Sequence, residues 1–132
     1  MQRTVDAAME EVEFHKALAA IWDLVRAANR YVDASAPWAL ARDASNRERL
    51  GTVLYNILEA ARICVLLSAP FVPAAARKMW AALGCPGEVA TANLADAGAW
   101  GGLRPGAALP RSAVAFPRIE DGMARPDPTV FP

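Results

Sequence analysis

The chain has 132 residues, a length that fits one domain with a buried core. Its formal net charge at pH 7 is zero, which argues against a freestanding nucleic-acid binder with a generally positive surface. Hydrophobic residues make up 55% of the sequence, and the many alanines and leucines among them favour helices over sheets. Cys64, Cys85 and the only histidine, His15, are too few to form a zinc site, and both thiols are expected to be reduced in a cytoplasmic protein.

The first predicted helix covers residues 5–33. Apolar residues recur in it at alternating spacings of four and three, as on one face of an amphipathic helix. They are Phe14, Leu18, Ile21, Val25, Ala28 and Val32. Pro37 disfavours helical geometry at Ala36 and therefore ends this element. A short helical turn is predicted over residues 38–40.

Two further helices are predicted after this break. Ser45 and Glu48 have the spacing of a capping box, which would start a helix over residues 46–68. That segment is apolar on a wide face, so it is expected to be central. Pro73 suits the first position of a third helix, which Gly84 ends. Asn93 can cap one more turn at residues 94–96.

Proline dominates the rest of the chain. Six of the ten prolines lie in residues 104–132, which predicts an extended or irregular tail, with a short docked strand over residues 114–119. The sequence therefore predicts an all-α bundle of three main helices plus short turns over residues 1–103, followed by a proline-rich tail. The most hydrophobic run, residues 63–67, is too short to span a bilayer, and the first residues lack the apolar core of a signal peptide, so no membrane partner is expected.

No residues in the sequence predict covalent chemistry. Gly101 and Gly102 lack the spacing of a phosphate-binding loop. His15 has no nucleophile in a recognisable arrangement, and Glu11 and Lys16 near it indicate a solvated helix face. We therefore predict no catalytic residue, no metal ligand and no cofactor within this chain.

The four tryptophans have different surroundings. Trp22 and Trp80 lie on predicted helices and are expected in the core, whereas Trp100 lies among small residues and could anchor a loop. Trp38 follows Pro37 at the helix break, between Arg30 and Arg42. From the residues alone it is either a plug in a helix junction or a flat platform on which a nucleobase stacks.

An ordered series of segments resembles one family over nearly the whole chain up to Glu120. The segments are residues 17–22 (ALAAIW), 27–33 (AANRYVD), 36–41 (APWALA), 50–60 (LGTVLYNILEA), 67–73 (LSAPFVP), 100–103 (WGGL) and 116–120 (FPRIE). Together they resemble the anticodon-binding domain of bacterial methionyl-tRNA synthetase. The series is specific, although each piece alone is weak.

The resemblance implies a helical bundle that binds the anticodon loop of methionine-accepting tRNA. In the family the tryptophan after the proline stacks on an anticodon base, which here implies Trp38, with Pro37 shaping the corner. Arg30 and Arg42 are candidate phosphate contacts, although ordinary solvated helix faces explain these arginines more simply.

The family's catalytic domain, with its ATP-binding signatures, is not found in these 132 residues. The family's upstream helix, which carries an asparagine and an arginine four residues apart, is not found either. We therefore expect a fragment of a methionine–tRNA ligase whose partners are methionine tRNA and the parent's catalytic domain, with ATP bound by the parent. The alternative is a helical interaction bundle without an RNA role, which would pair with a second copy through uncovered apolar surface.

Overall fold

A computed structural model describes residues 2–111 and 114–118, and the regular elements in these ranges are all helical. This confirms the predicted all-α class. In chain order, the elements are α1 (Gln2–Glu10), α2 (Phe14–Ser35), α3 (Pro37–Leu40), η1 (Ala44–Asn46), α4 (Arg47–Ser68), α5 (Pro73–Ala82), η2 (Val89–Thr91) and α6 (Leu94–Ala97).

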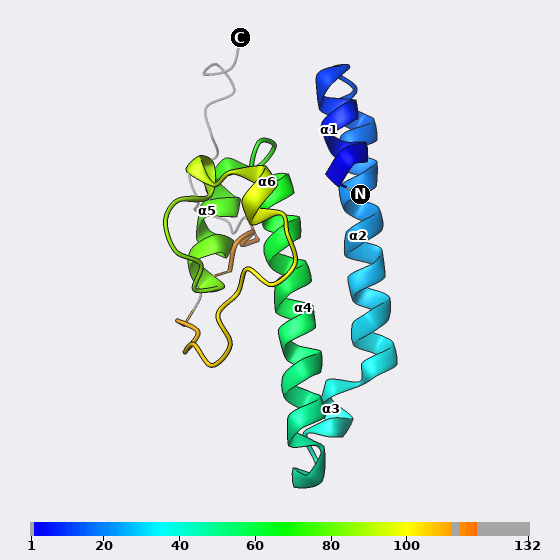
Figure 1. Ribbon diagram of the computed structural model, residues 1–132, viewed down its shortest axis with the longest axis vertical. Helices are drawn as coiled ribbons and strands as arrows, with labels where there is room; N and C mark the ends of the chain where they lie inside the picture. The colour runs from blue at the N-terminus through cyan, green and yellow to red at the C-terminus, as the bar shows by residue number, and fades with distance from the viewer. Residues whose placement is uncertain (1, 112–113, 119–132) are drawn as a thin grey trace.

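The two longest helices, α2 and α4, lie side by side as columns of 22 residues each (Figure 1). Helix α1 folds back along the first half of α2, and α5 and α6 lie against the second half of α4. Helix α3 joins the two columns at the opposite end of the molecule, where it contacts α4. One end of the bundle is therefore thick, and the other consists of little more than α2, α3 and the start of α4.

The core has two clusters, and α4 contributes to both. One cluster joins α1, α2 and α4 through buried residues: Val5, Ala8, Ala17, Ile21 and Leu67. The other joins α4 to α5 and η2 through Val65, Leu66, Ala76, Trp80 and Val89. Trp80 is buried as predicted, and its indole Nε1 donates a hydrogen bond to the Pro86 carbonyl at 3.2 Å. These contacts confirm the prediction that the second long helix, α4, is central.

The prediction of one unbroken helix over residues 5–33 is wrong. The chain turns between α1 and α2 at Val12, which has a φ of 60°, and Glu13 N donates to the Ala8 carbonyl at 2.7 Å. Folding back brings Val5 and Ala8 onto Ala17 and Ile21. Helical periodicity could not reveal the break, because the apolar residues on both sides keep nearly the same spacing.

The expected capping box is also absent. Asn46 precedes α4 without a side-chain cap, and Asp43 Oδ1 instead accepts from Ser45 N at 2.9 Å, which starts η1. This hydrogen bond lowers the pKa of Asp43 below its ordinary value. The cap predicted at Asn93 does form, because its Oδ1 accepts from Ala95 N at 2.9 Å.

The proline-rich segment carries no regular element in its described part, residues 104–111 and 114–118. The short strand expected over residues 114–119 is therefore not found at residues 114–118, and residue 119 lies outside the described residues. The division at residue 103 into a bundle and a tail stays a prediction.

Within the part of the chain that the structure describes, one helical segment, Ala44–Ser68, is long and apolar enough by composition to cross a membrane. The core helix of a water-soluble bundle meets the same criterion, and α4 uses its apolar residues in both core clusters. The apolar run at residues 63–67 is only the end of this segment, so its short length did not reveal the hydropathy of the whole helix.

Candidate nucleic-acid interface

The corner between α2 and α3 is built by two residues. Ala36 has left-handed backbone angles, φ 43° and ψ 61°, and its N–H donates to the Val32 carbonyl at 3.0 Å, which ends α2. Pro37 then starts α3, where its missing N–H is not needed. The Ala36 carbonyl accepts from Ala39 N at 2.8 Å at the start of α3, so the chain leaves α2 and enters α3 at this residue.

This corner decides which way the side chains of α3 face. Pro37 and Leu40 are half-buried, whereas the Trp38 side chain is 56% exposed. A large apolar ring is therefore presented to solvent on a short helix that contacts α4. The plug interpretation of Trp38 requires a sealed ring and does not agree with this exposure. A stacking platform requires an accessible ring of this kind.

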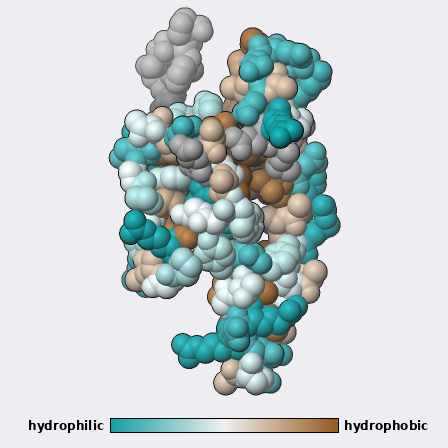
Figure 2. All heavy atoms as spheres, in the orientation of Figure 1, coloured by the Kyte–Doolittle hydropathy of each residue, from teal (hydrophilic) through white to brown (hydrophobic). Residues whose placement is uncertain are grey.

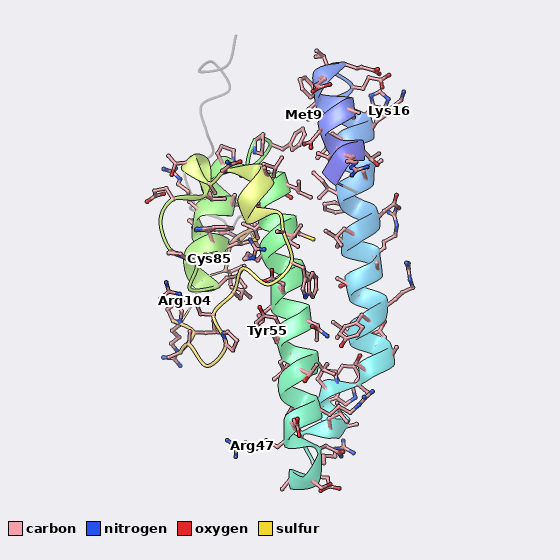
Figure 3. The ribbon with its side chains drawn as sticks, viewed as in Figure 1. Met9, Lys16, Arg47, Tyr55, Cys85 and Arg104 are labelled. Atoms are coloured by element: carbon pink, nitrogen blue, oxygen red, sulfur yellow. The ribbon has the colours of Figure 1, made fainter. Side chains whose placement is uncertain are left out.

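The candidate arginines lie on both sides of this corner. Arg30 is exposed on the last part of α2, and Arg42 is exposed directly after α3. Arg47 begins α4 at the same end of the molecule and points away from the helix pair (Figure 3). Hydrophilic side chains project from this end in the view of Figure 2, among less polar ones. Within the described parts of the chain, neither Arg30 nor Arg42 forms an ion pair, so both guanidinium groups are available to phosphates.

The prediction that Trp22 lies in the core is wrong, because its side chain is 57% exposed. Trp22 lines a groove between α2 and α4 with a volume of about 440 Å³, which we call the apolar groove. Its other lining residues come mostly from the predicted apolar faces of the two helices. They include Leu18, Val25, Val32, Ile57, Ala61 and Cys64, together with Phe71, Met79 and Phe116. The apolar stripe of the first predicted helix thus faces this groove more than the core.

A buried ion pair holds the loop that carries Trp100. Glu59 and Arg62 on α4 are 0% and 2% exposed, and Arg62 Nη2 donates to Glu59 Oε1 at 2.6 Å. Glu59 Oε1 also accepts from Gly101 N at 2.7 Å and Gly102 N at 2.8 Å, and its Oε2 accepts from Leu103 N at 3.0 Å. We call these two side chains and the loop backbone that they bind the Glu59 clamp.

The other side of the loop is fixed as well. Arg62 Nη2 donates to the Ala99 carbonyl at 2.7 Å. The Tyr55 hydroxyl, on the face of α4 nearest this loop, donates to the Leu103 carbonyl at 3.0 Å (Figure 3). The backbone is therefore bound before and after Trp100, while the indole itself remains 59% exposed. The expectation that Trp100 anchors the loop is wrong, because the buried charges of Glu59 and Arg62 on α4 anchor the loop.

The electrostatics of the clamp follow from these contacts. Burial alone would raise the pKa of Glu59, but hydrogen bonds from Arg62 and from the backbone of Gly102, Leu103 and Gly101 outweigh burial and hold it below its ordinary value. Glu59 is therefore a charged structural acceptor rather than a proton donor. Among the described residues, no three His, Cys, Asp or Glu side chains gather as metal ligands.

The family profile described as the anticodon binding domain of methionyl tRNA ligase matches residues 2–126. The chain belongs to this family.

Curated relatives of this anticodon-binding domain are methionine–tRNA ligases. The chain is 39% identical to the enzyme of Caldanaerobacter subterraneus subsp. tengcongensis over 120 residues, which are 91% of this chain and 18% of that protein. It is 37% identical to the Streptomyces coelicolor enzyme (85% of this chain, 22% of that protein) and 34% identical to the Clostridium acetobutylicum enzyme (88% and 17%). The chain thus spans about a fifth of the length of these relatives.

Sequence reasoning located the corner of this anticodon-binding domain but missed the Glu59 clamp. Glu59 and Arg62 are three positions apart within the most apolar helix. Two charges one turn apart in such a helix were the available signal, because ionised side chains are rarely fully buried unless they are paired. Their backbone partners are some 40 residues further along the chain, and no local pattern predicts that contact.

Proposed function

We propose that this anticodon-binding domain binds the anticodon loop of methionine-accepting tRNA with Trp38 as a stacking platform. The observation that carries the proposal is the exposed indole on the α2–α3 corner. Pro37 and the left-handed Ala36 hold the corner, so little conformational freedom is lost when a base stacks. Arg30 and Arg42 bind phosphates on either side of the stacked base.

The parent enzyme, in this proposal, is a cytoplasmic, ATP-dependent methionine–tRNA ligase. The part of it that binds ATP and methionine joins methionine to the tRNA, while this domain holds the other end of the tRNA. The catalytic domain is thus a second partner of this chain. The proposal rests on the names of the relatives and on the family match.

A titration of methionine tRNA against the 132-residue chain and its Trp38→Ala variant tests the stacking role. Base–aromatic stacking contributes about 1–3 kcal/mol, so the variant should bind roughly 5- to 150-fold more weakly. Trp22→Ala is the matched control, because Trp22 is 57% exposed but lies in the apolar groove. Equal affinities of the wild type and Trp38→Ala would show that Trp38 is not a platform.

The apolar groove favours a second candidate function, a protein-interaction bundle. A groove of about 440 Å³ lined almost wholly by apolar side chains is unusual on a free surface. If the groove binds a second copy of the chain, sedimentation should show a dimer whose stability falls in Trp22→Lys. A monomer at high concentration would contradict the dimer.

A further inference from the structure

Trp100 combines a rigid backbone with an exposed side chain. Some hydrogen bonds of the Glu59 clamp join Arg62 to Glu59. The others join these two side chains to the backbone of the loop around Trp100. None of these hydrogen bonds involves the indole, which is 59% exposed. A tryptophan that served only to fix the loop would be buried, so the arrangement presents the ring to solvent.

The exposed ring borders a small cleft between α2 and α4. The cleft has a volume of about 250 Å³, and its walls include Leu24, Tyr31, Asn56, Ile57, Ala60 and Trp100. We call it the Trp100 cleft. Asn56 Nδ2 donates to the Tyr31 hydroxyl at 3.1 Å, which leaves the second amide hydrogen and Oδ1 of Asn56 for other partners. The cleft thus offers two aromatic rings, an apolar floor, and one group that both donates and accepts.

We propose that the Trp100 cleft binds an unpaired RNA nucleobase, stacked on Trp100 and hydrogen-bonded at its edge to Asn56. Ring surface together with a few placed polar groups is the chemistry by which proteins recognise single-stranded bases. The apolar groove is larger, about 440 Å³ against about 250 Å³ for the Trp100 cleft. The smaller cleft suits a single base better than a peptide segment.

Two exposed arginines lie near the cleft on the side of the α3 end. Tyr31 also lines an adjoining hollow of about 410 Å³, so the two hollows meet at one side chain. The hollow carries one charge of each sign, Arg49 and Glu48, together with Ser45 and Thr52. Arg30 precedes Tyr31 on α2 and is exposed. A strand that follows this surface would have phosphates near Arg49 and a base in the cleft. The inference rests on the proposed function, because it adds a second base contact on the same tRNA.

Two measurements on the 132-residue chain test the cleft. In the first, methionine tRNA is titrated against Trp100→Leu, which should bind roughly 5- to 150-fold more weakly, and against Asn56→Leu, which should bind roughly 2- to 10-fold more weakly. Trp22→Leu is the control and should bind like the wild type. Thermal unfolding of Trp100→Leu should match the wild type, because the Glu59 clamp binds backbone rather than the indole.

In the second, the indole N–H signals are followed by NMR while an unstructured adenine-rich heptanucleotide RNA is added. The Trp100 signal, assigned with Trp100→Leu, should shift. If Trp100→Leu binds tRNA like the wild type and RNA does not move the wild-type Trp100 signal, the cleft proposal is overturned. Weaker tRNA binding by Trp38→Ala would still support the proposed function in that case. A shift of the Trp100 signal without any effect of Trp38→Ala supports the cleft and contradicts the stacking role of Trp38. If added catalytic domain, and not RNA, moves the Trp100 signal, the cleft is a protein contact and the proposal fails.

Discussion

Glu59 and Arg62, one turn apart on α4, form an ion pair that is almost completely removed from solvent, and Glu59 accepts hydrogen bonds from three successive backbone N–H groups 42 to 44 residues away. The desolvation of two charges is offset only when the pair and its remaining hydrogen-bonding groups are satisfied. Here the loop satisfies them, so α4 and residues 99–103 form one structural unit.

Glu59→Ala should therefore destabilise the domain strongly. It leaves Arg62 buried without its partner and frees three loop amides, and losing one member of a buried pair costs about 3–5 kcal/mol. Urea unfolding monitored by circular dichroism measures the change. Glu13→Ala, which removes a partly exposed ion pair with Lys16, is the control and should have a much smaller effect. Similar losses in the two variants would contradict the structural role of the clamp.

Stability should fall as the pH falls through the acid range. The pKa of Glu59 is lower in the folded than in the unfolded chain, so its stabilising effect is complete above the ordinary carboxyl pKa of about 4.5 and is lost as pH falls through the folded value. Glu13, through its hydrogen bond with Lys16, and Asp43, through its bond with Ser45 N, have pKa values lowered in the same direction. Melting temperatures between pH 7 and pH 3 should decline less in Glu59→Gln than in the wild type. Parallel curves would exclude Glu59 as a main source of the decline.

Gly102→Ala should also destabilise the domain. A Cβ atom at Gly102 would lie 2.5 Å from Arg62 Cζ and 2.7 Å from its Nη2, and the guanidinium cannot move without breaking the clamp. Overpacking of this kind costs about 1–3 kcal/mol. Gly51→Ala on α4 is the matched control, because nothing lies within 4 Å of its added methyl group, and alanine should stabilise the helix by about 0.5–1 kcal/mol. Urea midpoints that shift in the same direction in both variants would argue against the steric explanation.

Salt should weaken tRNA binding, and the corner arginines should account for part of the effect. Each phosphate contact contributes close to one unit to the slope of log K against log salt. Arg30→Gln and Arg42→Gln should each reduce the magnitude of this slope by roughly one. Arg77→Gln, an exposed arginine on α5 at the other end of the molecule, should leave it unchanged. An unchanged slope in the two corner variants would show that these arginines are solvated and contact no phosphate.

Local patterns in the sequence predicted the elements that depend on neighbouring residues. Pro37 ends α2 and starts α3, Asn93 caps α6, and Gly84, with a φ of 68°, follows α5. These features depend on backbone geometry and hydrogen bonds within a few residues, so a short window of sequence is enough to predict them. The fold-back of α1 could not be predicted in this way, because it depends on which apolar face finds a partner elsewhere in the chain.

The tryptophans show most clearly the difference between what local sequence predicts and what tertiary packing decides. Trp38 and Trp22 are exposed to nearly the same extent. The local sequence predicted the corner at Pro37, but it left open whether Trp38 is a buried plug or an exposed platform. Trp22 lies on a regular helix, and whether a helical side chain is covered depends on the elements that pack over it. The sequence of the loop around Trp100 does not predict that Glu59 on α4 binds the backbone of this loop.

Helix propensity, capping and proline geometry act between neighbouring residues, so the sequence by itself determined that this chain is helical and where most of its helices end. The ordered series of segments also indicated the family. Only the tertiary structure decided which apolar faces are covered, that two charges are buried on α4, and that Trp100 is held over a cleft with Tyr31 and Asn56. Those outcomes depend on contacts between segments tens of residues apart, and the free energy of such contacts belongs to the assembled bundle and not to any one stretch of the chain.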